Sequence, residues 1–147
     1  MDFPNYGKAG GYDAIQLLPS ARIMMSDPVE IVQTYLAAME ARELDKAKSM
    51  LGEGFQMVFP GTGVMNTLEQ LINWAGPRYR FVTKAYDGFD ALPGKVAVVY
   101  CYGTLAGEWP DGTAFSGIRF IDRFELRDGR IIRQDVWNDI AETQAGA

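Results

Sequence analysis

Helix-forming and strand-forming segments occupy different parts of this 147-residue chain. Apolar residues recur at helical spacing in the segments 28–39, 43–51 and 68–75. A short strand is expected between the second and third helices, at 55–59. From residue 79 onward, β-branched and aromatic residues predict strands at 79–87, 96–105, 114–126 and 131–137. Helices first and strands afterwards are typical of the α+β class, with the helices packed on one face of an antiparallel sheet.

Local signals mark the ends of several elements. Asp27 precedes Pro28, and its carboxylate is expected to accept the amide of Glu30, whose own side chain would reach back to complete a capping box. Residues 66–69 (Asn-Thr-Leu-Glu) repeat this pattern before the third helix. The Asp-Gly pair at 128–129 predicts a tight hairpin turn before the final strand.

The composition narrows the chemistry that is available. The sequence contains no histidine and one cysteine, Cys101, which excludes Ser-His and Cys-His nucleophile pairs, an internal disulfide and Cys-rich metal sites. Catalysis would have to use carboxylates, tyrosines, arginines or lysines, or a bound cofactor. We expect no metal and no cofactor.

Charge and hydropathy bear on which partners the protein can bind and on its cellular compartment. The net charge is −5, from 14 basic and 19 acidic residues, and no cluster of Lys and Arg predicts nucleic-acid binding. No apolar run approaches the roughly 18 residues of a membrane span. The first 27 residues lack a secretory signal pattern. We therefore expect a cytoplasmic protein with an N-terminal arm (1–26) followed by one domain (27–147).

Asp122 interrupts an apolar strand face. Alternate residues of a strand share a face, and here one face reads Ile118, Phe120, Asp122, Phe124 and Leu126. A carboxylate in the middle of such a face is costly unless it is paired or kept protonated. This position favours a cavity-lining acid or base. The alternatives are an ion pair with a neighbouring arginine and a bulge that turns the side chain outward.

An antiparallel sheet that wraps around helices leaves a concave pocket, which is the usual place for a ligand. Tyr35 lies on the core-facing stripe of the first helix, where it would either find a local hydrogen-bond partner or donate to a substrate oxyanion. Asp135 faces the pocket in one register, whereas a slip of one residue turns it outward to a salt bridge. The ligand-binding residues that we predict are Phe55, Phe59, Trp74, Tyr100, Tyr102, Phe120 and Asp135.

Two stretches carry a resemblance to a known superfamily. Residues 34–60 (TYLAAMEARELDKAKSMLGEGFQMVFP) resemble the opening helix pair and first strand of ketosteroid isomerases, and residues 118–139 (IRFIDRFELRDGRIIRQDVWND) resemble the closing hairpin of the same group. The group is the nuclear transport factor 2-like (NTF2-like) superfamily, which includes SnoaL-like polyketide cyclases and limonene epoxide hydrolases. The resemblance implies a cystatin-like cone, in which three N-terminal helices pack on a curved, mixed, mostly antiparallel sheet that encloses a pocket.

The catalytic residues of two enzyme types in this group are not all present at the matching positions of this sequence. Tyr35 stands where ketosteroid isomerases keep their oxyanion-binding tyrosine, but Phe59 replaces their general-base aspartate. The arginine and aspartate of the epoxide hydrolases fall within 100–103 (Tyr-Cys-Tyr-Gly), and their tyrosine and asparagine fall at Gln56 and Val58. Neither of these mechanisms is therefore expected.

The SnoaL-like comparison fits better. Those cyclases carry an acid/base aspartate six residues before the Asp-Gly of the closing turn, and Asp122 has this spacing from residues 128–129. The resemblance implies a homodimer that binds a small hydrophobic, oxygen-bearing molecule. Cofactor-free isomerase, cyclase or dehydratase chemistry would use Asp122 as the proton shuttle and Tyr35 as the oxyanion donor. The alternatives are a binding module without chemistry and an assembly subunit whose exposed sheet face, with Trp137, pairs with another chain.

Overall fold

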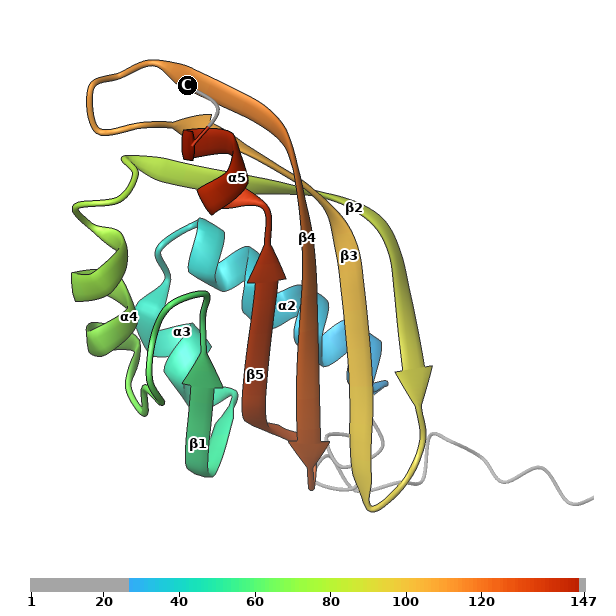
Figure 1. The fold of residues 1–147 in the computed structure, drawn as a ribbon. Coiled ribbons are helices and arrows are strands. Elements are labelled where there is room, and N and C mark those ends of the chain that lie inside the picture. The colour runs from blue at the N-terminus through green and yellow to red at the C-terminus, as the bar shows by residue number, and fades with distance from the viewer. Residues whose placement is uncertain (1–26, 146–147) are drawn as a thin grey trace, which may run out of the picture.

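A computed structural model describes residues 27–145 of the protein (Figure 1). The predicted arm at 1–26 lies outside the described residues. No helix in the described part is long and apolar enough to cross a membrane. The elements follow in the order α2 (Pro28–Glu40), α3 (Leu44–Ser49), β1 (Leu51–Val58), α4 (Leu68–Ala75), β2 (Phe81–Leu92), β3 (Val96–Glu108), β4 (Ala114–Arg127), β5 (Arg130–Asn138) and α5 (Ile140–Ala145).

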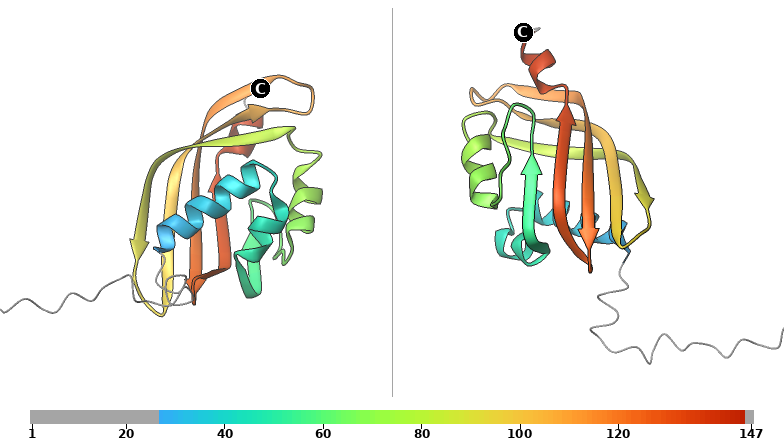
Figure 2. Two further views of the ribbon diagram at one scale, coloured as in Figure 1. Left: turned by 180° about the vertical axis from the view of Figure 1, so that it is seen from behind. Right: turned by 60° about the horizontal axis from the view of Figure 1, so that its bottom comes forward.

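The five strands form one mixed sheet in the order β1-β5-β4-β3-β2. β1 runs parallel to β5, and the other neighbouring pairs are antiparallel. β2, β3 and β4 bend strongly, and α2 lies across the concave face that this curvature creates, while α4 lies beside β1 (Figures 1 and 2). The structure confirms the predicted α+β class and cone architecture; the sheet is curved but not closed. The short C-terminal helix α5 was not predicted.

The helix caps differ in detail from the prediction. The Asp27 carboxylate accepts the amide of Val29 at 2.9 Å, not that of Glu30. The capping box of α4 is formed by Thr67 and Gln70, one residue later than the sequence pattern suggested. Asn and Thr are adjacent there and both are good caps, so the local sequence does not decide between them.

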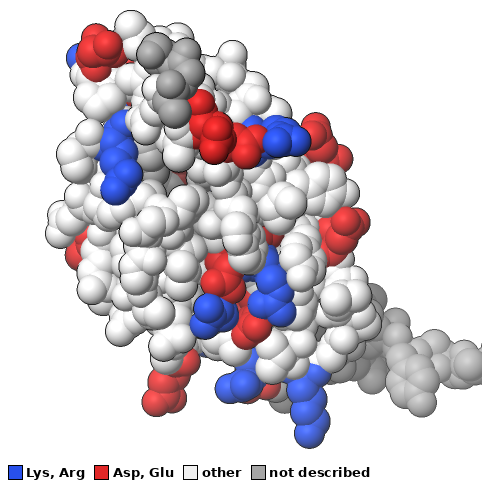
Figure 3. Space-filling view, viewed as in Figure 1, with Lys and Arg blue, Asp and Glu red and all other residues white. Residues whose placement is uncertain are grey.

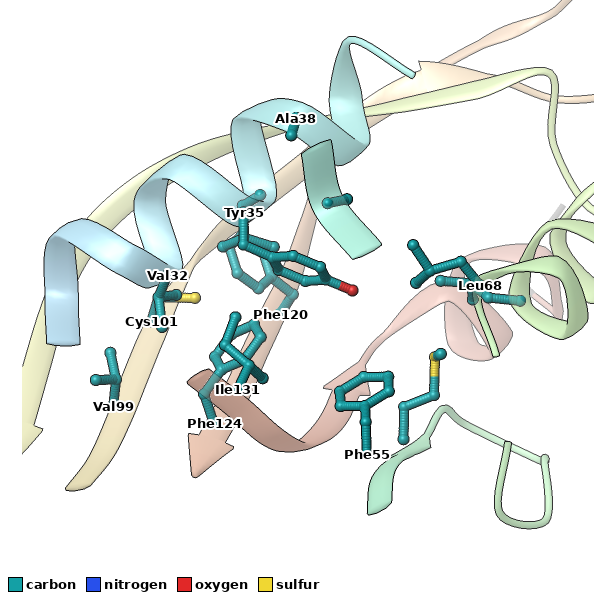
Figure 4. Close-up of a cluster of buried hydrophobic side chains, with 14 of the residues drawn as sticks. Val32, Tyr35, Ala38, Phe55, Leu68, Val99, Cys101, Phe120, Phe124 and Ile131 are labelled. Atoms are coloured by element: carbon teal, nitrogen blue, oxygen red, sulfur yellow. The ribbon is translucent and has the colours of Figure 1, made fainter. Parts of the chain in front are cut away.

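The core lies between α2 and the concave face of the sheet. β4 alternates as its sequence predicts, so that Ile118, Phe120, Asp122, Phe124 and Leu126 are buried. Tyr35 projects from α2 onto this face and meets Phe124 edge-on, with ring centroids 6.1 Å apart (Figure 4). The inner face of β3 carries small residues, among them Ala97, Cys101 and Gly103, and the last of these lets the backbone of β2 approach closely.

An irregularity in β2 sets which of its side chains face inward. The pairing of β2 with β3 shifts register between Tyr86 and Gly88. A bulge of this kind changes which face the following side chains occupy. Lys84 and Tyr86 before the shift and Phe89 after it all border hollows on the inner side of β2. Lys84 itself precedes the shift and faces the concave side because it pairs with the buried Leu105 of β3.

Candidate functional site

A cavity of about 160 Å³ opens between α2, α4 and the concave face of the sheet. Most of its wall is apolar. Phe59 and Trp74 form one side as an edge-to-face pair with centroids 5.5 Å apart. Arg78 lies over the Trp74 ring, 4.3 Å from its centroid. The remaining lining residues include Leu36, Met39, Leu71, Ile72, Ala75, Tyr79, Phe81, Val82, Leu105, Val136 and Ile140.

Asp122 of β4 is fully buried at the cavity wall. One of its carboxylate oxygens, Oδ2, forms a short ion pair with the ammonium of Lys84 on β2. The other oxygen, Oδ1, is buried and has no hydrogen-bond partner among the described residues. An ion pair of Asp122, which the sequence offered as an alternative with a neighbouring arginine, is present but is formed with a lysine.

Tyr35 of α2 lines the same cavity. Figure 4 shows the side chain extending away from α2, with its oxygen at the far end. This oxygen is also buried without a hydrogen-bond partner in the described part of the chain. Burial, reinforced by the negative charge of Asp122, raises the pKa of Tyr35 well above its ordinary value. The hydroxyl therefore keeps its proton and remains available as a donor.

Gln134 of β5 supplies a third polar group. Its side chain is only 3% exposed and borders the cavity, and its Oε1 atom has no partner within residues 27–145. Buried polar atoms in proteins are nearly always paired, so each exception needs an explanation. Three exceptions from three elements, Tyr35 on α2, Asp122 on β4 and Gln134 on β5, all border one cavity.

The structure brings only part of the predicted ligand-binding set to the cavity. Phe59, Trp74 and Phe120 line it together with Tyr35 and Asp122. Phe55 is buried in the adjoining core and does not line the cavity.

The predicted placement of Tyr100 and Tyr102 at the cavity is wrong. Both lie on the outer face of β3, opposite the buried Cys101, because the alternation of this strand turns its small residues inward. The Tyr100 hydroxyl accepts a hydrogen bond from Arg123 at 3.2 Å on that outer face. The sequence could not decide between the two faces, since both are largely apolar.

The predicted placement of Asp135 at the cavity is also wrong. Its carboxylate accepts two hydrogen bonds from Arg133, at 2.8 and 3.0 Å. It lies across from Arg123 in the β4–β5 register. With Glu125 these residues form a group of mixed charge on the convex face of the sheet (Figure 3). The outward salt bridge, which the sequence left open as an alternative, is the arrangement observed.

Lys84 and Gln134 are among the cavity residues that sequence reasoning missed. Lys84 shares the inner face of β2 with Val82, but a lysine in such a strand is usually solvated and gave no distinctive signal. Gln134 was not singled out by the sequence. Its position two residues before Val136, on the buried face of β5, could have identified it once the register was known.

A second hollow of about 440 Å³ lies outside the first, between α2 and β2. Tyr86 and Phe89 form its aromatic side, with ring centroids 4.8 Å apart. Glu40 and Lys84 border both hollows and so lie between them. Among residues 27–145 no cluster of three or more His, Cys, Asp or Glu side chains could hold a metal ion.

No protein-family model matches the chain, and no curated protein matches it. Many solved structures do. An NTF2-like protein of unknown function from Burkholderia pseudomallei superposes with a TM-score of 0.68 at 18% identity, covering 82% of this chain and 97% of that one.

TerC, crystallised with polyporic acid, gives a TM-score of 0.67 at 17% identity over 80% of this chain and 95% of its own. A putative SnoaL-like polyketide cyclase from Jannaschia gives a TM-score of 0.61 at 17% identity, covering 82% of this chain and 94% of that one. At this level of identity the likeness concerns the backbone architecture. The cone of helices and curved sheet that surrounds the cavity is the NTF2-like fold, in the form shared with SnoaL-like proteins.

Proposed function

We propose that the protein binds a small hydrophobic molecule that carries oxygen atoms, and that it acts on this molecule by cofactor-free acid/base chemistry of the isomerase, cyclase or dehydratase kind. The observation that carries the proposal is the convergence of three unpaired buried polar atoms on one apolar cavity. Leaving such atoms unpaired costs about 1–3 kcal/mol each. A ligand that hydrogen-bonds to them would recover this cost.

The two central groups suit complementary roles. Asp122, paired with Lys84 through Oδ2, has a free oxygen that can accept a proton from carbon or oxygen. Tyr35 keeps its proton and can donate to the carbonyl oxygen on which negative charge develops. A general base contributes about 10²–10⁴-fold, and one oxyanion donor about 3 kcal/mol of barrier.

The size of the cavity limits the ligand. A volume of about 160 Å³ is close to that of an engineered protein cavity of about 150 Å³ that binds benzene. The part of the ligand that reaches Asp122 is therefore a single ring or a fragment of similar size. The structural likeness to TerC, which was crystallised with polyporic acid, supports a cyclic ligand.

Proton exchange tests this function directly. Purified protein is incubated in deuterated water with a panel of small cyclic ketones, and NMR follows deuterium incorporation beside the carbonyl. We expect exchange that is catalysed by the wild type and abolished by Asp122→Asn. The outer-face variant Tyr100→Phe, as a matched control, should exchange at the wild-type rate. Equal exchange by Asp122→Asn would remove Asp122 from the mechanism, and saturable binding without exchange would favour the non-catalytic binding module.

We further propose that a second copy of the chain covers the convex face of the sheet. Ile121 and Trp137 are cross-strand partners there, with 47% and 55% of their surfaces exposed. The neighbouring charges of both signs, visible in Figure 3, can pair with their symmetry mates across a two-fold axis.

Analytical ultracentrifugation at micromolar concentration tests the dimer. We expect a dimer for the wild type and a monomer for Ile121→Glu. Leu92→Glu, an exposed apolar residue at the far sheet edge, should remain dimeric. A monomeric wild type would contradict the proposal.

A further inference from the structure

We propose that the cavity selects acidic enols and phenols and holds them as oxyanions, with Lys84 as the counter-ion. The inference rests on the proposed function, since it names the ligand class of the same cavity. It assigns to Lys84 a binding role that the motifs of the sequence did not suggest.

The position of Lys84 carries the argument. Its side chain is 19% exposed and ends at the inner wall of the cavity, where the ammonium contacts Asp122 and lies 4.7 Å from the centroid of the Phe120 ring. An ammonium has three donors, and hydrogen bonding to Asp122 Oδ2 uses one of them. The remaining donors are available to an oxygen of a ligand that lies beside Asp122.

Charge balance explains why an acidic hydroxyl fits this site. Before binding, the cavity holds the pair of Lys84 ammonium and Asp122 carboxylate, which is neutral in sum. A ligand whose hydroxyl group points at Asp122 Oδ1 can transfer its proton there: the ligand O–H bond breaks, the carboxyl O–H bond forms, and the ligand keeps the electron pair as an oxyanion. Lys84 then neutralises the ligand oxyanion in place of the carboxylate, so the sum of charges stays zero. Burying an uncompensated charge would cost far more.

Two further groups complete the recognition. The protonated Tyr35 hydroxyl can donate to the same oxyanion or to a neighbouring carbonyl oxygen. Gln134 Oε1 is an unpaired acceptor and favours a ligand with a second hydroxyl group. The other charged side chains at the cavity, Glu40 and Arg42, lie at the exposed C-terminal end of α2. Neither of them takes the place of Lys84 beside Asp122.

4-Nitrophenol is a suitable probe, because it has one ring and its neutral and anionic forms absorb at different wavelengths. The phenol is titrated with protein in a buffer below its own pKa, where the free probe is mostly neutral. With the wild type, we expect the bound probe to show the phenolate spectrum. The control Lys46→Met, which removes a surface lysine whose side chain is 56% exposed, should give the same spectrum and affinity.

Variants at Lys84 separate its charge from its contribution to folding. Lys84→Arg keeps the cation and is expected to keep the phenolate spectrum. Lys84→Met leaves the buried carboxylate unpaired, so the double variant Lys84→Met/Asp122→Asn, which has neither charge, provides a folded comparison. Asp122→Asn alone keeps the cation and is expected to retain the phenolate spectrum. In the double variant, which differs from it only at Lys84, we expect only the neutral spectrum and an affinity lower by about ten- to hundredfold, as loss of a charged hydrogen bond implies.

The outcomes distinguish the two proposals. Binding of neutral phenol by the wild type, or of phenolate by the double variant, would overturn the role of Lys84 and leave the cavity as a ligand site. Failure of any cyclic ketone or phenol to bind to the wild type would overturn the proposed function and this inference together.

Discussion

Lys84 on β2 forms an ion pair with Asp122 on β4, across the inner face of the intervening strand β3. In the register of the sheet, Lys84 pairs with Leu105, whereas Asp122 pairs with Cys101, four residues away along β3. The lysine side chain spans this distance along the inner face of β3, where Gly103 is the intervening inward position. Asp122 is the one charged residue that is fully buried in the described part of the chain, so this contact determines the electrostatics of the cavity.

A double-mutant cycle on Lys84 and Asp122 should show a large coupling free energy of unfolding. Lys84→Met leaves a carboxylate buried without a counter-charge, and loss of one partner of a buried pair costs about 3–5 kcal/mol. We expect a value toward the lower end, since Lys84 is 19% exposed. Adding Asp122→Asn should restore most of the lost stability. Urea unfolding of the four proteins measures the coupling, and additive effects of the two substitutions would show that the pair contributes nothing.

Tyr35→Phe should separate stability from function. The hydroxyl has no partner in the described residues, so its removal is expected to leave the free energy of unfolding unchanged or to raise it by up to about 1–3 kcal/mol. Ligand binding or turnover should fall at the same time. The measurements are urea unfolding and the deuterium-exchange assay.

Tyr100→Phe provides the contrast for this experiment. Its hydroxyl accepts a hydrogen bond from Arg123 on the outer face. We expect the Tyr100→Phe variant to lose about 0.5–1.5 kcal/mol of stability and to catalyse deuterium exchange at the wild-type rate. If Tyr35→Phe behaved in the same way, Tyr35 would have no part in the site.

Alkaline pH should destabilise the protein through Cys101. Burial, with the charge of Asp122 as a smaller cause, raises the pKa of the Cys101 thiol to about 12, while an unfolded cysteine titrates near about 8.5. Between these values the unfolded chain has lost a proton that the native chain keeps, so the unfolding free energy falls as the pH rises, by up to about 1.4 kcal/mol per pH unit.

Cys101→Ala should make this pH dependence shallower in urea unfolding between about pH 8.5 and 10, because it removes the titrating thiol. Above about pH 10 the buried Tyr35, whose pKa is also raised, adds a loss of the same sign. An identical slope for the variant and the wild type would show that Cys101 titrates normally.

Gly103→Ala should be destabilising. A Cβ atom at Gly103 would clash with the carbonyl oxygen of Ala85, which lies just before the register shift of β2. Overpacking of this kind costs about 1–3 kcal/mol. Gly63→Ala is the matched control, because a Cβ atom there has nothing within 4 Å. Equal unfolding midpoints for the two variants would contradict the tight approach of β2 to β3.

Much of the site was accessible from sequence because it depends on local alternation. Asp122 was identified from the apolar residues on either side of it in β4, and the structure buries it with Phe120 and Phe124. Tyr35 was identified from the helical stripe of α2, and it is 1% exposed. Lys84 could not be found in this way, because its partner is two strands away in the sheet and 38 residues away in the chain.

The sequence by itself determined the order of helices and strands and the faces of α2 and β4, because periodicity is a local property of the chain. Only the tertiary structure decided which face of β3 meets α2, because both faces are apolar and the choice depends on the space between helix and sheet. The small Cys101 fits that space, and the larger Tyr100 and Tyr102 lie outside. The same packing brings Lys84 to Asp122, since β3 separates their strands in the sheet and the contact exists only once β2, β3 and β4 have assembled.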